Sequence, residues 1–195
     1  MHARCVSRPA SRFLSALGAG MALMAAGPSH AQAELSACLA KLRQDAPAHG
    51  IQVAAFDAYT RDASLLASTV AAARSQPEGQ ETWWDYIAKT VDEERVADGR
   101  KLMQAQAGPL AQIADRYEVD GEALVAIFGI ETNYGTQLGR TRVLDAWLTR
   151  ACTEGKPLWI KNVYASVRLL SEGRVQPESF VGSWSGAFGM TQFIP

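Results

Sequence analysis

The sequence predicts a mainly α-helical fold built around a single core. Along most of the chain, apolar residues recur at spacings of three and four, which is the periodicity of one helix face. No stretch has the sustained alternation of apolar and polar residues that is typical of a half-buried strand. Hydrophobic residues fill 48% and charged residues 20% of the 195 positions, which indicates one globular domain.

The N-terminus has the pattern of a secretory signal peptide. Three arginines and no acidic residue precede an apolar run at residues 13–26, and small residues follow it. We expect cleavage after Ala31 or after Ala33, so residues 1–31 are interpreted as the signal peptide. A membrane anchor is the alternative, but the run is shorter than the roughly 18 apolar residues that span a bilayer.

Loss of this segment leaves 16 basic against 20 acidic residues, a net charge of −4. Nucleic-acid-binding proteins depend on clustered basic residues, so we do not expect a nucleic-acid partner. One histidine, His49, and two widely spaced cysteines then remain. They cannot supply a zinc site, and no serine motif accompanies His49, so we expect neither a catalytic triad nor a metal nor another cofactor.

The two remaining cysteines, Cys38 and Cys152, are predicted to form a disulfide, because exported chains fold in an oxidising compartment. Closing so long a loop stabilises a fold by at most about 4–5 kcal/mol. The alternative is lipidation of Cys38, since residues 35–38 are similar to a lipoprotein processing site. A polar stretch at residues 29–34 separates that site from the apolar run, which argues against lipidation.

The first half of the mature chain predicts three helical blocks. A helix over residues 34–46 ends at Pro47, and an alanine-rich, less regular segment covers residues 57–74. A linker follows at residues 75–79, and residues 81–107 form the third block. Its aromatic residues belong either to the core or to a platform that stacks on sugars; they are Trp83, Trp84 and Tyr86.

The second half predicts further helices and a non-helical end. A helix begins at Gly108-Pro109 and reaches Tyr117, and Asp120 caps the next helix, which runs through Ile130. Two more helices are expected over residues 143–151 and 158–172. The last stretch, residues 182–195, is rich in glycine and predicts no helix.

Glu131 is the candidate for acid chemistry. It falls on the same predicted helix face as Leu124, Ile127 and Phe128. Loss of water at the end of an apolar stripe favours the protonated form of a carboxyl, which a general acid requires. The alternative is a glutamate that reaches solvent or pairs with a nearby arginine. Gly129 allows close approach of another group, and Gly135 is expected to end the helix.

The final segment mixes hydrogen-bonding and aromatic side chains in the manner of a sugar-binding loop. Its glycines follow no strand and precede no Lys-Ser or Lys-Thr pair, so phosphate binding by a P-loop is not expected. A purely structural loop is the alternative. The residues that suggest sugar recognition are Ser183, Trp184, Ser185, Phe188, Thr191, Gln192 and Phe193.

Three ordered motifs, at residues 126–135, 142–146 and 182–195, resemble those of the B-type lytic murein transglycosylases. The resemblance covers residues 34–195, which we interpret as the catalytic domain. It implies a lysozyme-like fold, a periplasmic location and cleavage of the β-1,4 bond between N-acetylmuramic acid and N-acetylglucosamine. Peptidoglycan glycan strands are the implied partner, beside other cell-wall enzymes.

By this resemblance Glu131 matches the single catalytic acid and base, with formation of 1,6-anhydromuramyl ends. Ser183 matches a serine close to the acid, Gln192 a glutamine that contacts the saccharide, and Tyr134 an aromatic position beside the acid. Phe193 lies in the same motif and is assigned to substrate binding with them.

Two features depart from the family pattern. Lys156 alone stands where the family has a basic pair, and family members continue well beyond the position of Pro195. We therefore expect a domain that is incomplete at its C-terminus. A hydrolytic muramidase and an inactive fragment that binds peptidoglycan are the alternatives to a transglycosylase. Asp145 is expected to pair with Arg142 rather than to serve as a second catalytic carboxylate.

Overall fold

The computed structural model describes residues 30–75 and 81–195. Apart from its last two residues, the predicted signal peptide lies outside this part of the chain, and so do residues 76–79 of the predicted linker. The described residues are mostly helical, which confirms the predicted fold class.

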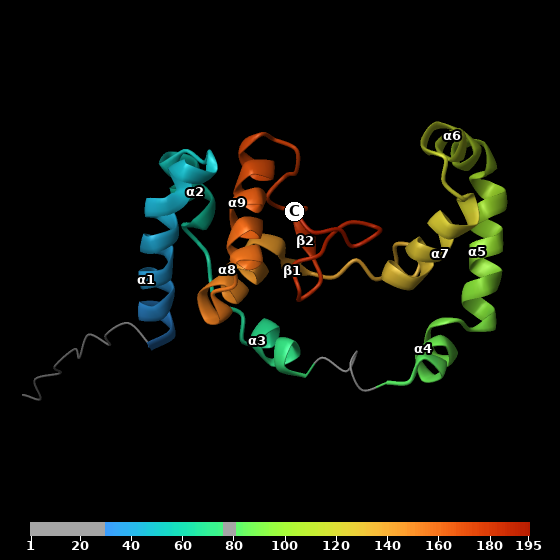
Figure 1. The fold of residues 1–195 in the computed structure, drawn as a ribbon, viewed down its shortest axis with the longest axis horizontal. Helices are drawn as coiled ribbons and strands as arrows, with labels where there is room; N and C mark the ends of the chain where they lie inside the picture. Colours follow the sequence, from blue (N-terminus) through green and yellow to red (C-terminus); the bar gives the residue numbers. More distant parts are fainter. Residues whose placement is uncertain (1–29, 76–80) are drawn as a thin grey trace, which may run out of the picture.

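The helices form two groups, with a small two-stranded sheet beside the first (Figure 1). Strands β1 (Thr141–Arg142) and β2 (Val181–Gly182) pair antiparallel, with Thr141 opposite Gly182. The first group holds α1 (His30–Asp45), the 3-10 helix η1 (Ala46–His49), α2 (Val53–Thr60), α3 (Ala67–Arg74), α8 (Val143–Glu154) and α9 (Pro157–Ser171). The second group holds α4 (Trp83–Thr90), α5 (Glu93–Ala105), α6 (Ala107–Tyr117) and α7 (Gly121–Thr132).

Side-chain caps explain where several helices begin. Asp120 accepts a hydrogen bond from the backbone N–H of Glu122 at 3.1 Å, which confirms the predicted start of α7. The prediction of one block over residues 81–107 was wrong. Helix α4 ends at Thr90, and Asp92 caps a separate helix, α5, by accepting from the N–H of Arg95 at 2.7 Å.

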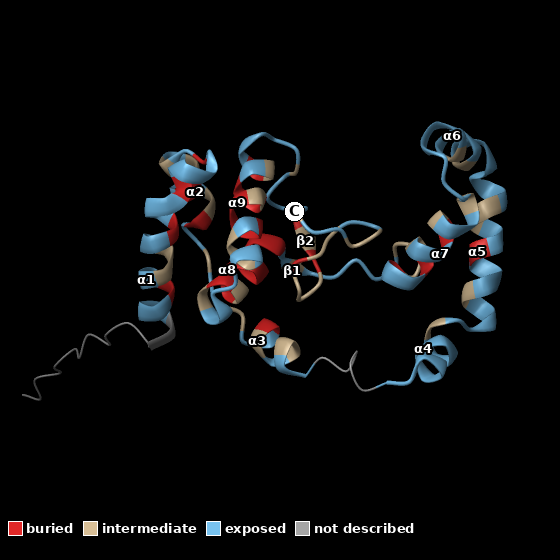
Figure 2. Cartoon of the chain, in the orientation of Figure 1, coloured by how far each residue is buried: buried red, intermediate tan, exposed pale blue. Residues whose placement is uncertain are grey.

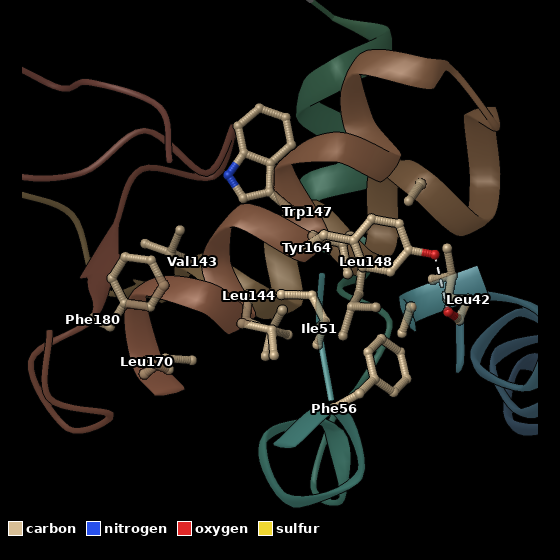
Figure 3. Packing of buried hydrophobic residues seen from close by; sticks show 14 residues of the cluster. Leu42, Ile51, Phe56, Val143, Leu144, Trp147, Leu148, Tyr164, Leu170 and Phe180 are labelled. Carbon is tan, nitrogen blue, oxygen red and sulfur yellow. Dashed lines mark hydrogen bonds between the residues drawn. The ribbon is translucent and has the colours of Figure 1, made fainter. Parts of the chain in front are cut away.

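The core lies in the first group, where α8 and α9 pack against α1 and α2 (Figure 3). Trp147 and Phe56 are its largest fully buried side chains. The hydroxyl of Tyr164 donates to the carbonyl of Leu42 at 3.0 Å, so even the polar end of this buried ring is paired. The predicted disulfide between Cys38 and Cys152 is present and joins α1 to α8.

The second group buries much less of its apolar surface (Figure 2). Helices α4 and α6 contain no buried residue. Trp83 is 59% and Trp84 67% exposed, so the interpretation of these aromatics as core residues was wrong for this chain. Their rings contact each other with centroids 3.9 Å apart. None of the helices in residues 30–75 and 81–195 combines the length and the apolar character needed to cross a bilayer.

Candidate functional site

Glu131 occupies the last turn of α7 and is exposed. Its carboxylate forms no hydrogen bond or ion pair with any other residue that the structure describes. Ile127, on the same face, is 48% exposed, whereas Val125, Gly129 and Thr132 are buried. The prediction that Glu131 ends a buried apolar stripe was therefore wrong, because packing against α5 and α6 turns a different face of α7 inward.

Helix α7 ends one residue after Glu131, at Thr132. Asn133 and Tyr134 have φ angles of 47° and 55°, in the left-handed region, and the N–H of Asn133 donates to the carbonyl of Gly129 at 3.0 Å. Asn133, not Gly135, therefore ends the helix, because asparagine tolerates this backbone conformation better than most residues. Glu131 therefore lies in the last turn before a left-handed helix end.

Tyr134 holds α7 against α5. Its ring lies on Gly129, where an added Cβ would meet ring atoms at 2.7 Å, and its hydroxyl donates to the carbonyl of Arg95 at 2.8 Å. Burial raises the pKa of the Tyr134 phenol. The close approach that Gly129 allows is thus used by this ring, and the hydroxyl that the sequence assigned to substrate is engaged between two helices.

Thr132 connects the end of α7 to the C-terminal loop. Its hydroxyl donates to the carbonyl of Met190 at 2.7 Å and accepts from the N–H of Gly135 at 3.1 Å. Only 1% of Thr132 is exposed. Sequence reasoning missed this residue, because a threonine at a helix end gives no sign of a partner 58 residues away.

Gln192 and Phe193 lie in the loop that Thr132 holds. Gln192 has a φ angle of 50°, and its side-chain amide donates to the carbonyl of Gly189 at 2.9 Å. A non-glycine residue in this conformation is strained, and such strain is often found at functional sites. Phe193 is 72% exposed, although its carbonyl accepts from the N–H of Phe188 at 2.9 Å. Its ring is therefore free to meet a ligand.

Ser183 lies at the base of the same loop, nearer the first helix group. Its hydroxyl is 2.9 Å from that of Ser185, and its N–H donates to the carbonyl of Ala187 at 2.8 Å. The indole N–H of Trp147 donates to the carbonyl of Gly186 at 2.9 Å, which anchors this turn to the core. The structure thus ties the loop that carries Gln192 and Phe193 to the end of α7 through Met190, and Ser183 forms no hydrogen bond with Glu131.

The predicted pairing of Asp145 with Arg142 is present at 3.2 Å. Asp145 is buried, and its burial raises the pKa of the carboxyl although the Arg142 charge opposes the shift. Arg142 also donates to the carbonyl of Asp62, so the pair fastens the segment between α2 and α3 to α8. Among the residues described, no three His, Cys, Asp or Glu side chains gather as a metal site requires.

Residues 34–195 match the family of the transglycosylase SLT domain. The chain belongs to this family. Membrane-bound lytic murein transglycosylase B of Escherichia coli is 28% identical over 123 residues, which are 62% of this chain and 34% of that protein.

Solved structures of this transglycosylase family share the fold. SltB3 from Pseudomonas aeruginosa, solved with NAG-NAM-pentapeptide, is 34% identical over 82% of this chain and 43% of its own length, with a TM-score of 0.75. SltB1 from the same organism is 26% identical over 80% of this chain and 54% of its own, with a TM-score of 0.72. The chain therefore spans between about a third and about half of the length of these relatives.

Proposed function

We propose that this chain is a lytic transglycosylase that cleaves the β-1,4 bond between N-acetylmuramic acid and N-acetylglucosamine in peptidoglycan. The observation that carries the proposal is the position of Glu131 at an exposed helix end that a hydrogen bond from Thr132 ties to the loop of Gln192 and Phe193. The family membership and the NAG-NAM-pentapeptide bound to SltB3 support the choice of substrate.

Glu131 acts in this proposal as both acid and base. The protonated carboxyl gives its proton to the oxygen of the leaving sugar as the bond between that oxygen and C1 breaks. The carboxylate then takes the proton of the muramyl C6 hydroxyl as that oxygen bonds to C1, so the carboxyl is regenerated and the product is a 1,6-anhydromuramyl end. SltB3 solved with NAG-anhNAM-pentapeptide supports this kind of product.

The exposed carboxyl of Glu131 becomes an effective acid only when substrate covers it. A glycan seated over the end of α7 would exclude water from Glu131, and loss of water favours the protonated form of a carboxyl. The free face of Phe193 offers a stacking surface for a sugar ring, and the amide of Gln192 offers hydrogen-bonding groups. Ser183 forms no hydrogen bond with Glu131, so we assign it to orienting the acetamido group of a bound sugar. Tyr134 serves by holding the helix that carries the acid.

The test is the release of soluble fragments from purified sacculi by Glu131→Gln. We expect release to fall at least about a hundredfold, which is the scale of general acid catalysis, while sacculus binding persists. Glu94→Gln is the matched control, because Glu94 is an exposed glutamate of α5 far along the chain from the motif. Equal activity of Glu131→Gln and its parent would refute the assignment.

Mass spectrometry of the released fragments separates the alternatives. Anhydro products lack one water relative to the products of a hydrolytic muramidase. A protein that binds sacculi without releasing fragments would instead be a non-catalytic wall-binding domain. The exposed apolar side chains of α4 to α7 favour this second candidate, because they leave the helices around the acid with little buried apolar surface.

We place the protein in the periplasm, with residues 1–31 as a cleaved signal peptide. The disulfide supports this location, because such bonds persist in oxidising compartments. It also uses the Cys38 sulfur that lipidation would require. Fractionation of cells with mass measurement of the mature N-terminus tests both points, and a pulldown with cell-wall extracts tests whether other cell-wall enzymes bind it.

A further inference from the structure

A cavity of about 340 Å³ lies between α3 and α8, in the helix group that does not carry Glu131. One face of each helix lines it, together with the residue that precedes α9. The lining residues are Thr69, Val70, Ala73 and Arg74 from α3, Thr149, Arg150, Thr153 and Glu154 from α8, and Lys156. None of the residues that we assign to glycan cleavage belongs to this wall.

The side chains around the cavity are predominantly cationic. Arg74, Arg150 and Lys156 carry positive charge, and Glu154 alone carries negative charge. Helices α3 and α8 both end here, and each carboxyl end contributes about half a negative charge that decays within the last turn. The cavity remains positive after this subtraction, which favours an anion as its ligand.

Arg150 is held in place by Trp159 and Glu154, and its two terminal nitrogens keep donors that no described residue accepts. Its side chain is 11% exposed, and its guanidinium carbon lies 3.7 Å from the centroid of the Trp159 ring. Only its Nε donates, to Glu154 at 3.3 Å, and neither terminal nitrogen bonds to another described residue. The terminal nitrogens are therefore open to acceptors that a ligand or water supplies.

The other polar groups of the wall are already engaged. Glu154 accepts from Lys156 at 2.9 Å and from the indole N–H of Trp159 at 3.1 Å. The hydroxyls of Thr69, Thr149 and Thr153 all donate to backbone carbonyls. Recognition of a ligand therefore falls to the cations rather than to the hydroxyls.

We propose that this cavity binds a phosphate group, either as the free ion or as the end of a small phosphomonoester. The cations come from α3, from α8 and from the start of α9, and together they offer more N–H donors than the two oxygens of a carboxylate accept. Arginine forks and lysine point charges are the usual partners of phosphate. The volume is at the lower end of small-molecule sites, which leaves room for a small organic portion.

The experiment is a calorimetric and tryptophan-fluorescence titration of the intact chain at constant ionic strength. The probes are inorganic phosphate, glycerol 3-phosphate and acetate, and fluorescence reports on Trp159 beside Arg150. We expect saturable binding of inorganic phosphate and only unsaturable salt effects with acetate. Saturation by glycerol 3-phosphate as well would identify a phosphomonoester as a source, and its failure would identify the free ion.

Variants assign the binding to this cavity. Arg74→Gln should weaken phosphate binding about tenfold, because one charge-assisted contact is lost. Arg150→Lys should weaken it less than Arg150→Gln, because it keeps the charge and loses the fork. Arg61→Gln is the matched control, since Arg61 is exposed and does not line the cavity.

Three results would overturn the proposal. They are acetate binding as tight as phosphate binding, no saturable binding of inorganic phosphate, and an equal loss in Arg61→Gln and Arg74→Gln. Arg74 is exposed, so its replacement leaves the core intact even where a change at Arg150 disturbs folding. This test measures phosphate binding and not the digestion of sacculi. Its failure would therefore leave the proposed cleavage of peptidoglycan untouched.

Discussion

The hydroxyl of Thr132 donates a hydrogen bond of 2.7 Å to the carbonyl of Met190, which lies 58 residues further along the chain. Thr132 follows Glu131 directly, and Met190 precedes Gln192 by two residues. One buried hydroxyl therefore connects the helix end that bears the proposed acid to the loop that bears the proposed saccharide contacts.

Replacing Thr132 with valine tests this connection. The variant keeps the shape of the side chain but leaves the Met190 carbonyl without its donor, which should cost about 1–3 kcal/mol of folding free energy. We also expect slower release of fragments from sacculi, with kcat reduced more than binding. Chemical denaturation and turnover assays measure the two effects.

Thr60→Val is the control for that variant. Thr60 is also buried, but its hydroxyl donates only to Phe56 within its own helix, at 2.8 Å. If Thr60→Val reduced turnover as much as Thr132→Val, the loss would reflect general destabilisation and the positioning role of Thr132 would be refuted.

Gly186→Ala should disorder the turn that contains Ser183. Gly186 has a φ angle of 89°, and an added Cβ would meet the Trp147 indole nitrogen at 2.5 Å. The change should break the bond between this indole and the Gly186 carbonyl and lower both turnover and the near-UV circular dichroism signal of Trp147.

Gly189→Ala separates the clash from the backbone strain. Gly189 has a similar φ angle of 78°, but an added Cβ there would meet nothing within 4 Å. It should cost only the roughly 1–2 kcal/mol of a left-handed alanine. An equal cost for both variants would show that the Trp147 contact does not hold the turn.

The sequence was most informative where structure depends on local signals. The Asp120 cap, the following helix α7 and the glycine-rich final loop were all predictable, because caps and turns depend on a few neighbouring residues. The disulfide was predictable because only two cysteines lie outside the predicted signal peptide. The family motifs identified the residues of the candidate site before any contact between them was known.

Orientation and long-range contacts could not be predicted in the same way. Periodicity placed Glu131 on a face with Ile127, but tertiary packing turned the face of Val125 and Gly129 inward instead. Nothing near Tyr134 in sequence indicates the Arg95 carbonyl that its hydroxyl binds. Such contacts join separate elements and leave no local pattern.

Asp145 should make stability depend on pH. Burial raises the pKa of this carboxyl above its ordinary value of 3.8, so the folded state binds the proton more tightly than the unfolded chain does. The resulting stabilisation is fully present below 3.8 and is lost as the pH rises through the folded pKa. Relative to Asp145→Asn, the parent should therefore gain stability as the pH falls through this window.

Chemical denaturation of both proteins at steps of pH measures that difference. Asp115→Asn is the control, because it makes the same replacement at an exposed aspartate. A parent that instead lost stability relative to Asp145→Asn on acidification would show that the pairing with Arg142 dominates over burial.

The disulfide should dominate the stability of the first helix group. It links residues 114 positions apart, and removal of such a link costs at most about 4–5 kcal/mol through the entropy of the unfolded chain. Cys38→Ser/Cys152→Ser should therefore melt well below the parent under oxidising conditions. Adding reductant should lower the melting temperature of the parent to that of the double variant and leave the variant unchanged. A parent that melts at the same temperature with and without reductant would mean that the packing of α1 on α8 suffices without the covalent link, and that the bond adds no measurable stability.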